Sequence, residues 1–205
     1  MAAERKVSTG FAVTTVYAAL SLAAAAVAVF GGVTRAQFGG VPAGPELPSD
    51  FLEGIVVATE VATLVLSVLT PFFWWVAVSL VMQLVTRLFG GSGPLAPMLA
   101  AVGVAGVPLA IAALVQALAT GLQVALGVQS TAGVTVGLLG GLLALAALVW
   151  HVVLVVIGAA LARGIGYGES AGSCAVSCVG CLGLIILVAV VLAGIGILLG
   201  ATAPQ

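Results

Sequence analysis

The chain has 205 residues, of which 63% are hydrophobic and only 5% carry a charge. A soluble domain is about 45–50% apolar and about 25% charged, so this composition excludes a soluble globular protein and indicates an integral membrane protein. The formal net charge of −1 and the single lysine, Lys6, argue against nucleic-acid binding, which needs clustered basic residues.

The few charged residues mark where apolar stretches end. A helix that crosses a bilayer needs about 20 consecutive apolar residues. The 75 uncharged residues between Arg87 and Arg163 must therefore turn back once, and Gly, Ser, Gln and Thr predict that turn at residues 127–133. We predict an all-α, polytopic transmembrane helix bundle in a single membrane domain with five crossings, approximately residues 9–32, 61–88, 95–121, 135–162 and 173–200.

The first predicted crossing follows Arg5 and Lys6, as the apolar core of a secretory signal peptide follows its basic residues. Its apolar run, residues 11–33, is longer than the 7–15 residues of such a core, so we expect an uncleaved helix. Residues 35–50 are rich in Gly and Pro and include acidic residues. This composition predicts an external loop.

The second crossing contains Pro71, which leaves two alternatives for the number of crossings. A split at Pro71 gives six crossings, whereas a proline kink within one membrane helix is tolerated and gives five. With five crossings and a cytoplasmic N-terminus, four of the five basic residues face the cytoplasm and only Arg35 lies outside. Cytoplasmic loops carry an excess of Lys and Arg, so we prefer five crossings in the cell membrane, with the C-terminus outside.

The third crossing combines a proline with a polar stripe. Pro108 lacks a backbone N–H and Gly103 lies in the preceding turns, so we expect a kink there with a neighbouring helix packed closely against it. Gln116, Thr120 and Gln123 follow at helical spacing. This stripe either lines a water-filled cleft or hydrogen-bonds a neighbouring helix, and we favour the neighbouring helix.

The fourth crossing carries small residues and the single histidine of the chain. Five residues recur at intervals of three, four and seven, and therefore share one helical face: Gly137, Gly141, Ala144, His151 and Gly158. His151 lies near mid-bilayer, where an ionisable group is costly and is a functional candidate by default. No acidic or basic residue falls at a similar depth, which favours a neutral imidazole bonded to a carbonyl over a proton relay.

The fifth crossing begins with Cys174, Cys178 and Cys181, spaced as C-x3-C-x2-C. This spacing also holds iron–sulfur clusters, but on loops of soluble domains. Buried cysteine on an apolar helix behaves as a small hydrophobe, so we expect packing, with no metal and no cofactor. The chain also lacks a set of side chains that would assemble a reaction site, so we expect no enzymatic activity.

The central hairpin resembles the Yip family, the Ypt-interacting multipass membrane proteins. Five features carry the resemblance: the run ending in Arg87-Leu88-Phe89-Gly90-Gly91, then Leu99, then Gly103 five residues before Pro108, Trp150 in the fourth crossing, and the Gly-Glu-Ser-Ala turn at residues 168–171. The resemblance implies a five-pass protein with a cytoplasmic N-terminus, of the prokaryotic type.

Eukaryotic members of this family are linked to vesicle trafficking and to Rab GTPases. The present chain departs from the family pattern at Val104, where a tyrosine is common, and only about ten residues precede its first apolar run. We therefore do not expect a Rab-type partner.

We expect a non-enzymatic membrane protein that acts through helix–helix contacts in membrane organisation or trafficking-like roles. Its expected partners are the lipid bilayer and a second copy or other membrane proteins. The expected packing residues are Gly103, Pro108, Gly137, Gly141 and Gly158. The alternative is a small transporter or channel component that uses a polar path through the membrane near His151, Gln116 and Thr120.

Overall fold

The computed structural model describes residues 2–39, 49–177 and 179, which fall in helices and in the short turns between them. In chain order the helices are α1 Ala2–Phe30, α2 Val33–Gly39, α3 Ser49–Leu88, α4 Leu95–Ala105, α5 Val107–Leu126 and α6 Thr131–Arg163. A further helix covers residues 167–177. The described chain contains no strand, and the predicted all-α helix bundle is confirmed.

Four segments of the described chain are long and apolar enough to cross a membrane: Val7–Phe30, Glu53–Leu88, Leu95–Leu126 and Thr131–Arg163. They overlap the first four predicted crossings. Of the predicted fifth crossing, residues 173–177 and 179 are helical, and the rest lies outside the described residues.

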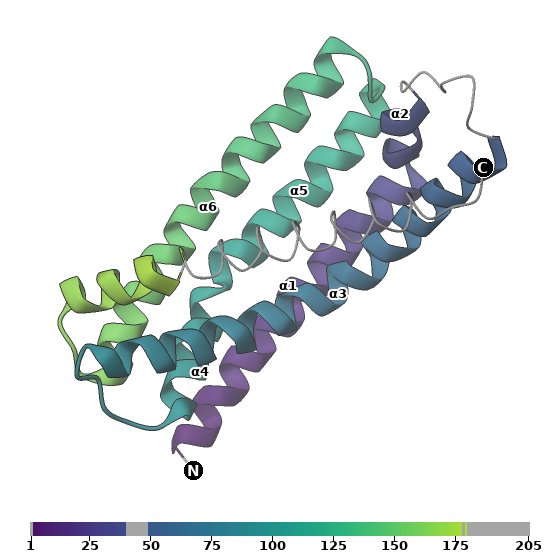
Figure 1. Ribbon diagram of the computed structural model, residues 1–205. Coiled ribbons are helices and arrows are strands. Elements are labelled where there is room, and N and C mark those ends of the chain that lie inside the picture. The colour runs from purple at the N-terminus through teal and green to yellow at the C-terminus, as the bar shows by residue number, and fades with distance from the viewer. Residues whose placement is uncertain (1, 40–48, 178, 180–205) are drawn as a thin grey trace, which may run out of the picture.

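α3 is one continuous helix of 40 residues that passes through Pro71. Proline removes a single backbone donor and bends a helix, and a membrane helix tolerates this while its turns on both sides stay hydrogen-bonded; α3 bends along its length in Figure 1. The structure therefore lacks the turn on which the alternative with six crossings depends.

The predicted external loop, residues 35–50, differs from the structure at both of its ends. Helix α2 extends to Gly39 and α3 begins at Ser49, while residues 40–48 lie outside the described residues. Two contacts hold α2 in place. Arg35 pairs with Glu60 of α3 through Nε and Oε1 at 3.1 Å, and Gln129 Nε2 donates to the carbonyl of Ala36 at 3.2 Å.

The broken pair α4–α5 forms the centre of the bundle. α4 packs against α1, α3 and α6, and α5 packs against α1 and α6 (Figure 1). The break comes at Gly106, between Ala105 at the end of α4 and Val107 at the start of α5. Pro108 follows in the first turn of α5, where its missing N–H removes no helical hydrogen bond. The interruption expected near Gly103 and Pro108 is thus a boundary between two helices.

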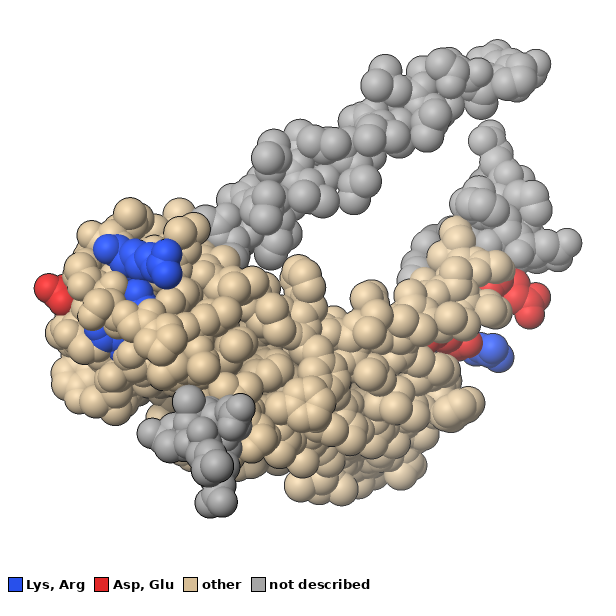
Figure 2. Space-filling model, turned by 90° about the horizontal axis from the view of Figure 1, so that it is seen from below, with Lys and Arg blue, Asp and Glu red and all other residues tan. Residues whose placement is uncertain are grey.

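The bundle has two ends of different charge. One end holds the start of α1, the α3–α4 turn and the end of α6, and the other holds α2 and the α5–α6 turn (Figure 1). We call the first the arginine end, because Arg87 and Arg163 close α3 and α6 there. The second is the acidic end, where Glu53 and Glu60 lie with Arg35 near the start of α3. Figure 2 shows the basic and acidic groups separated in this way.

The hydrophobic core lies in the half of the bundle nearer the arginine end. Its buried members come from α3, α4, α6 and the helix over residues 167–177: Met82, Met98, Val102, Ala105, Val155, Ala159 and Cys174. The indole of Trp75 adds a polar link there, because its N–H donates to the carbonyl of Leu99 at 2.8 Å. This bond joins α3 to α4 within the core.

Candidate functional site

His151 is enclosed within the bundle and bound to a backbone carbonyl. Its side chain is 4% exposed, and Nδ1 lies 2.7 Å from the carbonyl oxygen of Ala105. A carbonyl oxygen only accepts, so Nδ1 carries a proton and donates it. Ala105 is the last residue of α4, and the final carbonyls of a helix lack helical donors. His151 thereby ties α6 to the break between α4 and α5.

A cavity of about 20 Å³ lies beside His151. Its polar lining includes Thr14 and Tyr17 of α1, and its apolar lining includes Trp74 and Leu109. A volume of this size holds about one water molecule. The described surroundings of His151 are therefore those of a packed side chain, with no room for a chain of waters.

The predicted polar stripe of α5 lies against α6. A Cβ built on Gly137 would lie 3.2 Å from Nε2 of Gln123, and one on Gly140 would lie 3.1 Å from Oε1 of Gln116. Thr120, between the two glutamines on α5, is buried. The glycines of α6 thus leave the space that the glutamine side chains occupy, and the stripe belongs to the α5–α6 contact.

Two of the predicted packing glycines lie where helices approach most closely. A Cβ on Gly103 of α4 would lie 2.5 Å from the Cα of Gly10 in α1. A Cβ on Gly158 of α6 would lie 3.0 Å from the Cβ of Ala101 in α4. Real Cβ atoms do not approach backbone this closely, so the α1–α4 crossing depends on the absence of a side chain at Gly103.

Gly141 differs from its expected role. It is exposed, and no heavy atom lies within 4 Å of the position that its Cβ would take. The contact with α5 is made by Gly140 instead, which is buried. Intervals of three and four residues only approximate the helical repeat of 3.6 residues. Such a pattern therefore cannot tell which of two neighbouring residues, here Gly140 or Gly141, meets the other helix.

Arg163, the last residue of α6, holds three segments together. It is 3% exposed, and its Nε donates to Oγ1 of Thr86 in α3 at 3.2 Å. Its Nη2 donates to the carbonyl of Gly91 at 2.8 Å, and its Nη1 donates to the carbonyl of Gly93. In the opposite direction, the N–H of Ser92 donates to the carbonyl of Arg163 at 3.3 Å. These bonds join α6 to α3 and to the α3–α4 turn.

The α3–α4 turn can enclose this guanidinium because it is made of glycine. Gly90 and Gly93 have φ of 81° and 122°, in the region that only glycine adopts readily. Gly91 has no room for a side chain, since its Cβ would lie 2.8 Å from the carbonyl oxygen of Thr86 and 3.3 Å from Nε of Arg163. The glycines therefore present their carbonyls to Arg163 at close range.

The contacts of Arg163 were missed by sequence reasoning, which used this residue only as a marker of the membrane boundary. The available signal was the combination of a glycine-rich turn with an arginine that closes another helix at the same end of the bundle. Carbonyls in such a turn lack helical donors, and a guanidinium carries five donors in a fixed geometry.

Of the three cysteines that were expected to pack, Cys174 is buried and belongs to the hydrophobic core with Met82 and Ala159. Cys178 and Cys181 fall outside the described side chains. Among the residues that the structure describes, no three His, Cys, Asp or Glu side chains lie close enough together to hold a metal ion. Cys174 therefore fills core volume.

The role of His151 can be tested by replacing it with leucine. We expect the free energy of unfolding to fall by about 1–3 kcal/mol, because the carbonyl of Ala105 loses its donor. The measurement is equilibrium unfolding in mixed micelles of a mild and a denaturing detergent. An unchanged stability, together with loss of a proton flux into proteoliposomes, would contradict the packing role and favour a relay.

Comparison with known proteins gives a match at the level of the family. The sequence pattern of the Yip1 domain family matches residues 1–190, which include all the helices described above. No curated protein and no solved structure matches the chain.

Proposed function

The chain belongs to the Yip1 domain family of multi-pass membrane proteins, and we propose that it acts without catalysis, through contacts of its helices with other membrane proteins or a second copy. One observation carries this proposal. The polar side chains that could have formed a reaction site or a path, those of His151, Gln116, Gln123 and Arg163, lie instead in contacts between helices. The described chain therefore offers mainly apolar helix faces to its surroundings.

The outer face of α6 also supports this proposal. α6 packs against α4 and α5, while leucines along its other side are exposed, among them Leu138, Leu142 and Leu145. In a bilayer such a face meets lipid or another transmembrane helix. Association between membrane helices depends on close packing and on interhelical hydrogen bonds, so a partner helix would gain from the glycine at Gly141 on the exposed surface.

For the orientation, we propose that the arginine end faces the cytoplasm and that the protein lies in the cell membrane. The basic residues Arg87 and Arg163 and the start of α1 share this end, and cytoplasmic segments are enriched in Lys and Arg. The N-terminus is then cytoplasmic. A fifth crossing over residues 173–200 would leave the C-terminus outside.

The alternative role as a transporter or channel component receives less support. Such a role needs a polar path near His151, Gln116 and Thr120, whereas His151 lies beside a cavity of only about 20 Å³ and Gln116 packs against Gly140. We therefore keep the proposal of helix contacts as the function.

Photo-crosslinking in native membranes tests the proposal. A benzophenone amino acid at Leu142 of α6, which is 62% exposed, or at Leu66 of α3 should yield adducts of higher mass. Two differently tagged copies of the chain distinguish a second copy from another protein. If neither position gives an adduct and the protein runs only as a monomer on native gels in mild detergent, the proposal is wrong.

A further inference from the structure

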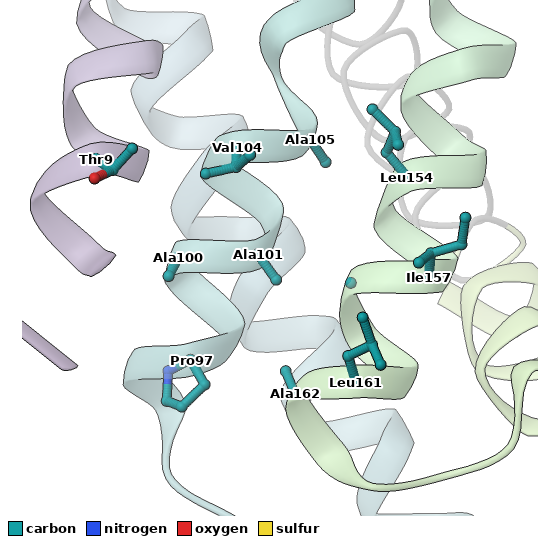
Figure 3. Close-up of a pocket in the computed structure, with 11 residues that line it drawn as sticks. Thr9, Pro97, Ala100, Ala101, Val104, Ala105, Leu154, Ile157, Leu161 and Ala162 are labelled. Atoms are coloured by element: carbon teal, nitrogen blue, oxygen red, sulfur yellow. The ribbon is translucent and has the colours of Figure 1, made fainter. Parts of the chain in front are cut away.

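A groove of about 620 Å³ lies on the outside of the bundle, in the half nearer the arginine end. It runs between α4 and α6, and Thr9 of α1 stands at its edge (Figure 3). Its lining combines small residues, including Ala100, Ala101 and Gly158, with larger apolar ones, including Val104, Ile157 and Leu161. Its volume falls within the range of about 300–1,000 Å³ that is typical of sites for small ligands.

Positive charge gathers at the end of the bundle where this groove ends. The sequence places four basic residues there, Arg5, Lys6, Arg87 and Arg163, with two acidic ones, Glu4 and Glu169, which gives +2. Among the described residues, the opposite end has Arg35 with three acidic residues, Asp50, Glu53 and Glu60, which gives −2, and Glu46, outside the described residues, completes the net charge of −1.

Two of these basic positions lie close to lining residues of the groove. Arg163 follows the lining residue Ala162, and a Cβ on Gly93 would lie 3.6 Å from the carbonyl oxygen of Ala162 and 3.8 Å from Nη1 of Arg163. Arg5 precedes Thr9 by four residues in α1, so the two positions share one helix face, with Arg5 one turn nearer the end of the bundle. The apolar groove thus ends near a basic rim. The guanidinium of Arg163 is buried in its own hydrogen bonds, so the charge of this rim that a ligand would meet comes from the positions Arg5 and Lys6 in the first turns of α1.

We propose that this groove binds an acyl chain of an anionic phospholipid, whose phosphate lies at the arginine end near the first turn of α1. The apolar walls suit a hydrocarbon chain, and the basic rim lies where the headgroup of that chain would be. A helix of a second copy could fill the same groove, but it would gain nothing from the basic rim. Charge complementarity therefore selects the anionic lipid, and this selection does not depend on the proposed helix contacts.

Native mass spectrometry of the full-length protein tests this assignment. The protein in mild detergent is offered equal amounts of phosphatidylglycerol and phosphatidylcholine, and the lipid that remains bound is counted. We expect phosphatidylglycerol to be retained about 10-fold or more over phosphatidylcholine, since each nearby basic residue favours an anionic lipid by about 5-fold.

Two variants with matched controls locate the lipid. Val104→Trp narrows the groove at a position that is 45% exposed and should abolish the retained lipid, whereas Val149→Trp, on α6 away from the groove and 65% exposed, should retain it. The double variant R5A/K6A should reduce retention of phosphatidylglycerol by about 5-fold or more and leave phosphatidylcholine unchanged. Arg35→Ala, at the acidic end, should change neither lipid.

Three results would overturn the proposal. Equal retention of the two lipids would remove the anionic selectivity. Unchanged retention in Val104→Trp would remove the groove as the site. Conversion of a dimer to a monomer by Val104→Trp, with the bound lipid unchanged, would assign the groove to a second copy of the chain.

Discussion

Replacing Arg163 with alanine is expected to lower the free energy of unfolding by about 3–5 kcal/mol, as judged by equilibrium unfolding in mixed micelles. The guanidinium is nearly fully buried and donates to the Thr86 hydroxyl and to the carbonyls of Gly91 and Gly93. Its removal leaves the Thr86 hydroxyl and the carbonyl of Gly91 without this donor, leaves the carbonyl of Gly93 with Gln83 Nε2 alone at 3.2 Å, and opens a space between α3, α6 and the α3–α4 turn.

Two further variants separate the hydrogen bonds of Arg163 from its charge. Arg87→Ala removes an exposed positive charge at the same end of the bundle and should change the stability by less than about 0.5 kcal/mol. Arg163→Lys keeps the charge but loses the planar arrangement of donors, so its stability should fall between that of the parent and that of Arg163→Ala. Equal losses in Arg163→Ala and Arg87→Ala would show that the buried contacts contribute nothing.

Replacing Gly103 with leucine should destabilise the protein by about 3 kcal/mol. The first atom of any side chain at this position would lie 2.5 Å from the Cα of Gly10 and 2.9 Å from its carbonyl carbon and oxygen. Because these are backbone atoms, α1 and α4 must move apart, and the contacts on both sides of the crossing are weakened. The measurement is again unfolding in mixed micelles.

Gly141→Leu is the matched control for this substitution. Gly141 lies on an exposed helix face with open space around it, and leucine is a better helix former than glycine by up to about 1 kcal/mol. Its stability should therefore be unchanged or higher. The closeness of Gly10 and Gly103 also predicts that Gly10→Leu and Gly103→Leu together cost less than the sum of the two. Strict additivity would mean that the helices do not meet at these residues.

The apolar helices and a kink near Pro108 could be predicted from the sequence because each follows from local chemistry, but the structure has a full break at Gly106 between α4 and α5. Apolar length alone indicates a membrane helix, and the missing N–H of Pro108 favours a helix start. The carbonyl partner expected for His151 also followed from local reasoning, since the sequence offered no charged residue at its depth. The structure supplies that partner as Ala105.

Contacts that depend on how one helix faces another could not be predicted in the same way. Gly140 and Gly141 are neighbours in the chain, yet only Gly140 meets α5, because the rotation of α6 is set by its packing. The inward direction of Arg163 depends on carbonyls 72 and 70 residues earlier in the chain, at Gly91 and Gly93. Charge and position along the chain carry no information about either.

The length of α3 has a consequence for the membrane around the protein. At about 1.5 Å per residue its 40 residues extend about 60 Å, roughly twice the hydrocarbon thickness of a typical bilayer. Because Asp50, Glu53 and Glu60 fall in its first twelve residues, the uncharged part over residues 61–86 extends only about 39 Å, an excess over the hydrocarbon that tilting of the helix relieves at a fraction of a kcal/mol per Å. We therefore expect the acidic start of α3 to project about 18 Å beyond the hydrocarbon layer, into the headgroups and the water beyond them.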